Sequence, residues 1–512
     1  MRHLGVPSRR CRDSLLDSFY RGVLVVSNRN IVRRVAMSAL LCLATVSGAP
    51  ARAQSADISE TPLLGSPQKF EPTEESLAKH RVPSWYMNAK LGIFIHWGLY
   101  SVPGYAPREA REFRIEEIGA QQKRVNPYAE WYYNTLRVPN SPTAQFHRNA
   151  YGAKYDYYDF AHVFNDDTRL WNPAAWAELF KETGARYVVL TTKHHDGFTL
   201  WPSSITNPHL RSDQSHSARD LVGDLTEAVR QSGMKMGFYY SGLYDWSFGS
   251  GPFIADDNNA IAIEEQGPQY PSYADAHWRE LIVKYRPDIL WNDIGYSPKG
   301  KALEIASEFY NSNPDGVIND RWKPFKFHDF TTPEYAKLDF ISTEKWEECR
   351  GLGKSFGLNR IEGPEETISA GALVALLVDI VAKNGNLLLD VGPEPDGTIP
   401  PIQVDRLHKL GAWLKQNGEA IFDTRPWIRA TGRTADGIDV RFTAKDNVIY
   451  AIVLGRPKGN SVTLLDVSAS GHSRATMLGS DAGLTALAQG NNLRISMPPE
   501  LPGDYAWVIR LN

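Results

Sequence analysis

The feature that most constrains the fold is a long alternation of short apolar segments with amphipathic stretches. Seven apolar segments of strand length cover residues 92–97, 187–192, 236–241, 288–291, 316–319, 338–343 and 386–391. Helical patterns lie between several of them, at residues 172–182, 219–231, 274–285 and 368–383. Strands that alternate with helices predict a parallel sheet. This many repeats favours a (β/α)8-like (TIM) barrel with some irregular elements, and a doubly wound open sheet is the alternative.

The pattern changes after Trp427. Short segments, often alternating between apolar and polar residues, follow one another without helical stretches, at residues 438–442, 448–454, 461–467, 493–497 and 505–511. This spacing is typical of an antiparallel β-sandwich. We therefore predict a barrel domain over residues 83–425 and a small C-terminal β-sandwich over residues 426–512.

The N-terminal residues indicate an export signal. Arg33 and Arg34 precede an apolar run at residues 35–46 (VAMSALLCLATV), and Ala51-Arg52-Ala53 follows, which is the order of a signal peptide and its cleavage site. The run is shorter than the roughly 20 apolar residues that a membrane-spanning helix needs. We predict that residues 1–53 are removed and that the protein is periplasmic or secreted.

The mature chain is expected to begin with a polar, flexible lead-in over residues 54–82. Removal of residues 1–53 leaves Cys349 as the sole cysteine. One cysteine cannot form an internal disulfide, so the hydrophobic core has to stabilise this exported protein.

The composition excludes one class of partner and agrees with another. A formal net charge of −3 and a pI near 6.5 give no reason to expect a polyanion, so we predict no nucleic-acid partner. The chain contains 14 Trp and 23 Tyr. Aromatic side chains offer flat apolar faces on which sugar rings stack, although protein cores use them too.

In a barrel, functional side chains lie at the C-terminal ends of the strands. Polar and aromatic residues end or follow the expected strands at His96, His194, His195, Tyr239, Tyr240, Trp291, Asp293, Arg321, Glu347 and Glu348. A single histidine after a strand is more often scaffolding than catalyst. The recurrence of such residues at corresponding strand ends nevertheless indicates one shared site.

The adjacent histidines in TTKHHDGFTLW raise the question of a metal. Neighbouring residues on a strand point to opposite faces, so His194 and His195 are poor ligands for one ion unless the chain turns at Gly197. No H-x-H, H-E-x-x-H or C-x-x-C pair accompanies them. We predict no metal and no cofactor, and a metal-dependent hydrolase using His194, His195, Asp196 and Asp293 remains an alternative.

Two carboxylates are the sharper feature. Asp293 in ILWND and Glu347 in STEKWEEC each stand beside a tryptophan. Two carboxyl groups across a barrel mouth, one ionised and one protonated, are what glycoside hydrolysis requires. The alternative for each is structural, as a helix cap or an ion-pair partner of Arg321 or Arg350.

Together, seven motifs resemble the family 29 glycoside hydrolases, the retaining α-L-fucosidases. They are residues 85–103 (WYMNAKLGIFIHWGLYSVP), 130–132 (EWY), 187–198 (YVVLTTKHHDGF), 291–293 (WND), 319–322 (NDRW), 346–349 (WEEC) and 384–397 (NGNLLLDVGPEPDG). Their order and rough spacing hold over most of the expected barrel, and the trailing β-domain fits as well.

The resemblance implies an exo-acting enzyme that releases terminal α-L-fucose from fucosylated oligosaccharides or glycoconjugates through a glycosyl-enzyme. It implies Asp293 as nucleophile and Glu347 as acid/base, with Glu348 and Glu344 as rivals. The residues implied to line the fucose pocket are His96, Glu130, Trp131, His194, His195, Tyr239 (or Tyr240), Trp291 and Arg321. A non-catalytic glycan-binding protein with the same fold is the remaining alternative. Linkage preference, the oligomeric state and the role of the C-terminal domain are not predicted.

Overall fold

The computed structural model describes residues 69–108, 126–249, 266–323, 325–468 and 474–512. The expected leader at residues 1–53 and the first part of the lead-in lie outside these ranges. Within them, no helix is both long enough and apolar enough to cross a membrane.

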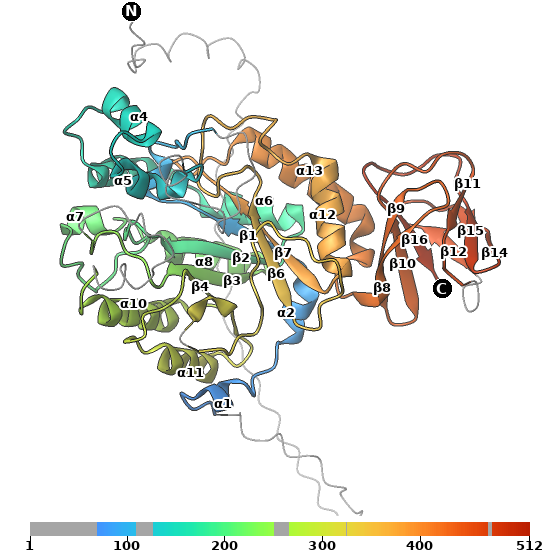
Figure 1. Ribbon diagram of the computed structural model, residues 1–512, viewed down its shortest axis with the longest axis horizontal. Coiled ribbons are helices and arrows are strands. Elements are labelled where there is room, and N and C mark those ends of the chain that lie inside the picture. Colours follow the sequence, from blue (N-terminus) through green and yellow to red (C-terminus); the bar gives the residue numbers. More distant parts are fainter. Residues whose placement is uncertain (1–68, 109–125, 250–265, 324, 469–473) are drawn as a thin grey trace, which may run out of the picture. The chain divides into compact units, whose positions relative to one another are not determined.

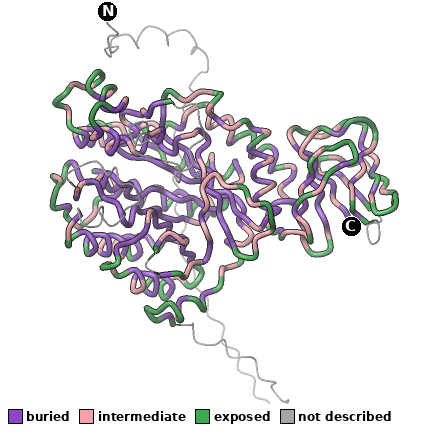
Figure 2. Tube along the Cα trace, viewed as in Figure 1, coloured by how far each residue is buried: buried purple, intermediate pink, exposed green. Residues whose placement is uncertain are grey.

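Seven parallel strands form one sheet in the order β5-β4-β3-β2-β1-β7-β6 (Figure 1). Their bounds are β1 Leu91–Ile95, β2 Tyr187–Lys193, β3 Lys235–Ser241, β4 Ile289–Asp293, β5 Val317–Ile318, β6 Trp346–Gly351 and β7 Gly385–Val391. Nearly every residue of these strands is buried, as Figure 2 shows. Burial on both faces explains why strands such as GIFI and NLLLDV read as continuous apolar runs rather than as alternations.

A short extended segment at residues 329–334 closes the sheet between β5 and β6. Phe330 forms a parallel bridge with Asn319 beyond β5, and Thr331 forms one with Trp346 of β6. The amide of Glu347 donates to the carbonyl of Thr331 at 2.8 Å. The segment therefore takes the place of an eighth strand, and the predicted (β/α)8-like barrel is confirmed, with an irregular element at this position.

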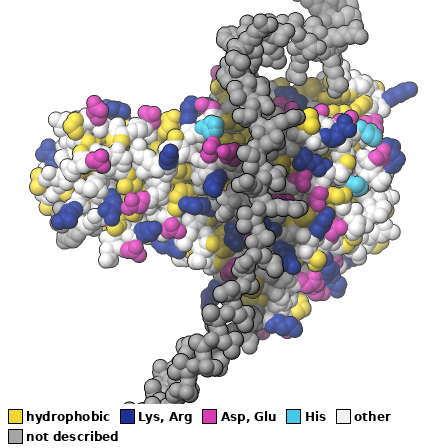
Figure 3. Space-filling view, turned by 180° about the vertical axis from the view of Figure 1, so that it is seen from behind, with side chains coloured by type: hydrophobic (Ala, Val, Ile, Leu, Met, Phe, Trp, Pro, Cys, Tyr) yellow, Lys and Arg dark blue, Asp and Glu magenta, His cyan; other side chains and the backbone are white. Residues whose placement is uncertain are grey.

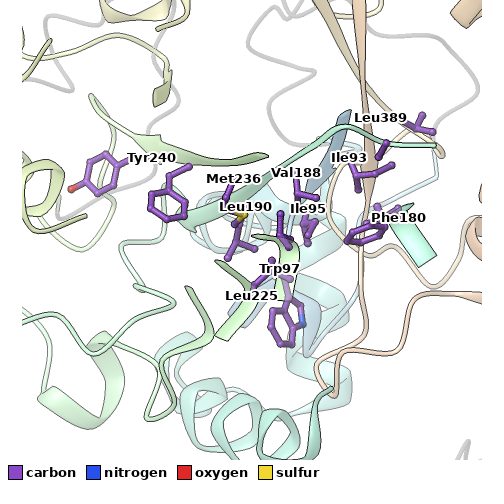
Figure 4. Packing of buried hydrophobic residues seen from close by; sticks show 14 of the residues in the cluster. Ile93, Ile95, Trp97, Phe180, Val188, Leu190, Leu225, Met236, Tyr240 and Leu389 are labelled. Carbon is purple, nitrogen blue, oxygen red and sulfur yellow. The ribbon is translucent and has the colours of Figure 1, made fainter. Parts of the chain in front are cut away.

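Helices cover the outside of the barrel (Figure 1). They are α6 Pro173–Thr183, α8 Leu221–Gln231, α10 Tyr270–Tyr285, α11 Ala302–Ser312, α12 Ala370–Ala382 and α13 Pro401–Asn417. In α6 the Asn172 side chain caps the helix by accepting from the Ala174 amide at 3.1 Å, and Pro173 occupies the first turn, as the sequence predicts. Figure 4 shows the apolar layer between strands and helices, with Ile93 and Leu190 on the strands and Phe180 on α6.

The strand predicted at residues 338–343 is wrong. The structure has no strand there, and Phe340 is 64% exposed. The strand that follows in the sheet is β6, whose sequence WEECRG is too polar to be recognised from periodicity. Glu347 is consequently the second residue of a strand and does not follow the end of one.

Residues 69–82 differ from the flexible lead-in that the sequence predicts. Phe70 and Leu77 are buried, and a short helix, α1 Glu74–Leu77, is capped by Thr73. The His80 ring is held at 2.7 Å from a carboxylate oxygen of Asp329, in the segment that closes the barrel. Isolated apolar residues in a polar stretch carry no periodic signal, which is why the sequence did not reveal this packing.

The C-terminal region forms two antiparallel sheets, and the predicted β-sandwich is confirmed. One has the order β13-β12-β16-β10-β9-β8 and the other β11-β15-β14. Their strands are β8 Arg425–Arg433, β9 Asp439–Lys445, β10 Val448–Val453, β11 Ser461–Leu464, β12 Ala475–Met477, β13 Gly483–Leu484, β14 Ala486–Gln489, β15 Asn492–Ser496 and β16 Trp507–Leu511. The domain limit at residues 425 and 426 stays a prediction.

Polar contacts join this region to the barrel helices. Asp379 of α12 accepts from Arg441 of β9 and from Lys383 at 2.6 Å. The indole of Trp413 in α13 donates to the carbonyl of Ala506 at 3.0 Å. On the face shown in Figure 3, basic and acidic side chains are interspersed, in keeping with a net charge near zero.

Candidate active site

The C-terminal ends of β3 and β4 place Asp293 at the centre of the site. Asp293 is the last residue of β4, and its carboxylate accepts from the Tyr239 hydroxyl and from Arg321 Nη1, both at 2.8 Å. Burial alone would raise the pKa of Asp293. The positive charge of Arg321 and the hydrogen bonds from Tyr239 and Arg321 outweigh burial and hold the pKa below its usual value. The carboxylate is therefore ionised at neutral pH.

A second carboxylate, Glu334, shares the same guanidinium nitrogen. Glu334 Oε1 lies 2.5 Å from Arg321 Nη1, while Asp293 Oδ1 lies 2.8 Å from it. Two oxygens bound to one nitrogen at these distances are at most about 5.3 Å apart, so the two carboxyl groups are close neighbours, as in retaining glycosidases, whose carboxyl groups lie about 5 to 5.5 Å apart. The structure thus brings together a carboxylate pair that the sequence analysis did not predict.

Glu334 was missed because its strand was missed. It ends the segment at residues 329–334, and a bridge to Cys349 of β6 fixes its backbone. The segment DFTTPE is short and contains Pro333, so it does not have the pattern of a central strand. The sequence did contain a weak strand pattern, because Phe330 and two threonines, which favour strands, precede the acidic residue.

Glu347 does not share a hollow with Asp293. It is fully buried, and its Oε1 accepts from the Trp291 indole at 3.0 Å. Its Oε2 accepts from the hydroxyls of Tyr86, at 2.8 Å, and Tyr187. Tyr187 is the first residue of β2, so Glu347 lies near the amino end of the barrel whereas Asp293 lies at the carboxyl end. Burial raises the pKa of Glu347. The expected pairing with Asp293 is contradicted by this placement.

The two rivals of Glu347 are also away from the site. Glu348 alternates with Glu347 on β6 and therefore faces the helix layer, where burial raises its pKa to about 7. Glu344 has a side chain that is 73% exposed, 3.9 Å from His328.

Three buried histidines lie at the carboxyl ends of β1 and β2. His96 Nδ1 is 2.6 Å from Asp390 Oδ1, and His195 Nδ1 is 2.6 Å from Ser241 Oγ. The His194 ring stacks on Tyr239 at 5.7 Å between centroids. Burial lowers the pKa of all three histidines well below the usual value, so each is neutral. Neutral rings are suited to exchange hydrogen bonds with hydroxyl groups.

Aromatic side chains surround these polar groups. The Trp131 ring lies edge-on to His195 at 5.2 Å, and Phe356 lies 5.0 Å from His96. Trp291 is 1% exposed, and the Arg321 guanidinium lies over its ring, 4.6 Å from the ring centroid. Trp291 therefore lies beneath Arg321. Phe356 was not among the lining residues predicted from the sequence.

Glu130 and Tyr239, both predicted from the sequence, lie close to these groups. Glu130 accepts from the Gly357 amide at 2.8 Å, and burial raises its pKa to about 7 despite that hydrogen bond. Tyr239, rather than Tyr240, faces the site, because the Tyr240 hydroxyl lies 3.0 Å from His277 in the helix layer.

The geometry gives no support to a metal set at the histidine pair. Among the residues that the structure describes, no three His, Cys, Asp or Glu side chains gather as metal ligands. Asp196 directs one oxygen to the Tyr157 hydroxyl at 2.7 Å and the other to the Phe198 amide at 3.2 Å.

Comparison with protein families gives two matches that together span most of the chain. Residues 58–419 match the model of the alpha-L-fucosidase family. Residues 436–512 match the model of the alpha-L-fucosidase C-terminal domain. The two matches correspond to the barrel and to the β-sandwich.

Curated relatives and solved structures agree with these matches. The chain is 32% identical over 471 residues to an alpha-L-fucosidase of Dictyostelium discoideum, covering 87% of this chain and 95% of the relative. It is 31% identical to tissue alpha-L-fucosidase of Homo sapiens, covering 87% and 92%. The crystal structure of Thermotoga maritima alpha-fucosidase in complex with fucose is 41% identical, with a TM-score of 0.79 and coverage of 87% and 100%.

Proposed function

The chain belongs to the alpha-L-fucosidase family, and we propose that Asp293 and Glu334 are the carboxyl pair of its reaction. The protein is a glycoside hydrolase, an exo-acting retaining α-L-fucosidase, whose substrates are fucosylated glycans. The observation that carries the assignment is the sharing of Arg321 Nη1 by the two carboxylates. Glu334 therefore replaces Glu347 as the acid/base.

Asp293 attacks the anomeric carbon of fucose, while Glu334 gives its proton to the oxygen of the leaving group. The bond between carbon and leaving oxygen breaks, and a fucosyl ester of Asp293 forms. Glu334, now a carboxylate, then takes a proton from water, whose oxygen attacks the anomeric carbon and releases Asp293. Arg321 and Tyr239 keep Asp293 ionised for the first step.

Arg321 also couples the two steps. Formation of the fucosyl ester removes the negative charge of Asp293, while the guanidinium stays between the two side chains. Its charge then stabilises the Glu334 carboxylate, which is the form needed to activate water. Arg321 thus stabilises the negative charge of Asp293 before the ester forms and that of Glu334 afterwards.

The surrounding residues suit a 6-deoxy sugar. Such a pocket needs hydrogen-bond partners for the ring hydroxyls and an apolar patch for the methyl group. We assign the hydroxyl contacts to His96, His194, His195 and Glu130. Trp131 and Phe356 supply apolar surface, and Trp291 supports Arg321 from below.

Azide rescue tests the assignment of the carboxyl pair. In Glu334→Ala, azide is expected to restore turnover of a nitrophenyl α-L-fucoside and to yield the α-fucosyl azide, because azide replaces water in the second step. Glu347→Gln serves as the comparison, and azide is expected to leave its turnover unchanged. Rescue of the Glu347 variant in place of the Glu334 variant would overturn the proposal.

We propose further that the protein is exported, to the periplasm or the medium. The basic pair Arg33 and Arg34, the apolar run and the Ala51-Arg52-Ala53 site support this location. Sequencing the N-terminus of the mature protein should give a start near Gln54. A mature chain that retains the apolar run would contradict cleavage.

A further inference from the structure

We infer that Ser241 is a positioning residue that fixes which ring nitrogen of His195 carries the proton. His195 then presents a hydrogen-bond acceptor to the substrate, and its partner is a hydroxyl of the sugar ring that donates. This inference rests on the proposed function for the identity of the substrate, but the state of the histidine can be tested without any substrate.

The first step is the direction of the Ser241 hydrogen bonds. Ser241 is the last residue of β3, is fully buried, and its hydroxyl donates to the carbonyl of Tyr244 at 2.7 Å. A carbonyl only accepts, so the single proton of the serine is committed to that bond. Ser241 Oγ lies 2.6 Å from His195 Nδ1 and must accept there. Nδ1 of His195 therefore carries a proton.

The second step is the charge of the ring. His195 is 1% exposed, and burial together with the charge of Lys193 lowers its pKa well below the usual value. A neutral imidazole with a proton on Nδ1 has a lone pair on Nε2. Nε2 lies 3.9 Å from Asp293 Oδ2, which is too far for a hydrogen bond. With the proton held on Nδ1 by Ser241, His195 Nε2 does not donate a hydrogen bond to the Asp293 carboxylate.

The third step is what Nε2 can recognise. An unprotonated ring nitrogen accepts a hydrogen bond and repels another acceptor, so its partner has to be an O–H group. A deoxy or fluoro sugar cannot supply that proton. His194 differs, because its Nδ1 has no hydrogen-bond partner among the described residues, so no bond at Nδ1 fixes where its proton lies. His195 is therefore the histidine of the pair that discriminates donors from acceptors.

Nitrogen NMR of the full chain with ¹⁵N-labelled histidine tests the proton position directly. The His195 signals, identified by their loss in His195→Gln, are expected to show a protonated Nδ1 and an unprotonated Nε2. In Ser241→Ala the proton is expected to move, at least in part, to Nε2. A protonated Nε2 in the wild type, or an unchanged pattern in Ser241→Ala, overturns the inference even if the protein hydrolyses fucosides.

Kinetics test the consequence for recognition. Ser241→Ala should lower kcat/KM for an aryl α-L-fucoside by about 10- to 100-fold, the loss expected for one misdirected buried hydrogen bond. Across the 2-, 3- and 4-deoxy fucosides, the wild type should reject one analogue strongly and Ser241→Ala should reject that analogue less. Equal discrimination by both proteins would overturn the inference, whereas an inactive wild type would instead overturn the proposed function.

Ser307→Ala is the matched control. Its hydroxyl is also buried, donates to the carbonyl of Phe70 at 2.8 Å and accepts from Asn311 at 3.4 Å, but it lies in α11, away from the site. Its discrimination among deoxy sugars should equal that of the wild type. Should Ser241→Ala fail to fold, Ser241→Cys keeps the volume, replaces the hydroxyl by a weak acceptor, and is read by the same NMR signals.

Discussion

The two ends of the barrel each hold a buried carboxyl group, and the two groups have opposite surroundings. At the amino end, Glu347 is held by two tyrosine hydroxyls and an indole, all neutral donors. At the carboxyl end, Asp293 and Glu334 share the charge of Arg321. Burial of an acid is common to both ends. The kind of neighbour separates an acid that is fixed in place from acids that can exchange charge and protons.

The carboxyl groups at the two ends also differ in how far they are exposed. The Glu347 residue has no exposed surface, whereas the side chains of Asp293 and Glu334 are 10% and 19% exposed. A glycosidic oxygen has to reach the acid within hydrogen-bond distance. Glu347 does not meet this requirement, because it is fully buried and its two oxygens accept from Trp291, Tyr86 and Tyr187.

The largest effect is expected from removal of the Asp293 carboxylate. Asp293→Gly should lower kcat for a nitrophenyl α-L-fucoside by at least about 10³-fold, a barrier change of about 4 kcal/mol, because Asp293 is the group proposed to form the ester. Azide should yield the β-fucosyl azide with this variant, the opposite anomer to that expected from Glu334→Ala. Arg321 keeps Glu334 as a partner, so an unchanged circular dichroism spectrum is the control. Near-normal turnover would remove Asp293 from the mechanism.

The next prediction concerns stability at the amino end. Glu347→Leu leaves two hydroxyls and an indole N–H buried without their acceptor, at a cost of about 3 kcal/mol or more in the free energy of unfolding. Glu334→Leu is the matched change at the carboxyl end and should cost less, because Arg321 keeps Asp293 as its partner. Urea denaturation of both variants measures the difference. Equal losses would erase the distinction between the two ends.

The sequence predicted the barrel well because its central strands are apolar on both faces. Runs such as YVVLTTK and NLLLDV indicate buried parallel strands when amphipathic helical patterns lie between the apolar runs. The same reasoning failed for β6, where Glu347 is compatible with a strand only because Tyr86, Tyr187 and Trp291 surround it. Those partners come from distant parts of the chain, so no local pattern reveals them.

The positions of site residues could be predicted where those residues end or follow recognisable strands. Asp293 and the histidines follow recognisable strands, so their approach to one another was foreseeable from barrel geometry. Glu334 ends a segment whose strand character exists only through bridges to Asn319 and to residues of β6. The error about Glu347 was therefore an error about where a strand begins, rather than about the chemistry that the site requires.

Asp329 has surroundings intermediate between those of Glu347 and those of Asp293. It begins the segment that ends in Glu334, and its Oδ2 accepts from the Tyr310 hydroxyl at 2.6 Å and the Ile318 amide at 2.8 Å. Its Oδ1 lies 2.7 Å from His80 Nδ1. Asp329 thus combines the neutral donors found around Glu347 with a cationic partner of the kind found at Asp293.

The smallest predicted effect is the pH dependence of this pair. Burial lowers the pKa of His80, but the hydrogen bond and charge of Asp329, the Pro314 carbonyl and the more distant Asp315 outweigh it, so the pKa is raised. The stacked Tyr310 ring and Phe70 complete the surroundings. Because the folded-state pKa exceeds the unfolded value of about 6.5, the stabilisation is complete below that pH and is lost as pH rises through the folded-state pKa.

His80→Gln measures that contribution. Its cost in the free energy of unfolding should be about 1 kcal/mol larger at pH 5.5 than at pH 9, because only the protonated ring donates to both Asp329 and the Pro314 carbonyl. Urea denaturation at the two pH values gives both numbers. A cost that does not change with pH would mean that His80 is held as a neutral ring, and Asp329 would then belong with Glu347, among the acids fixed by neutral donors alone.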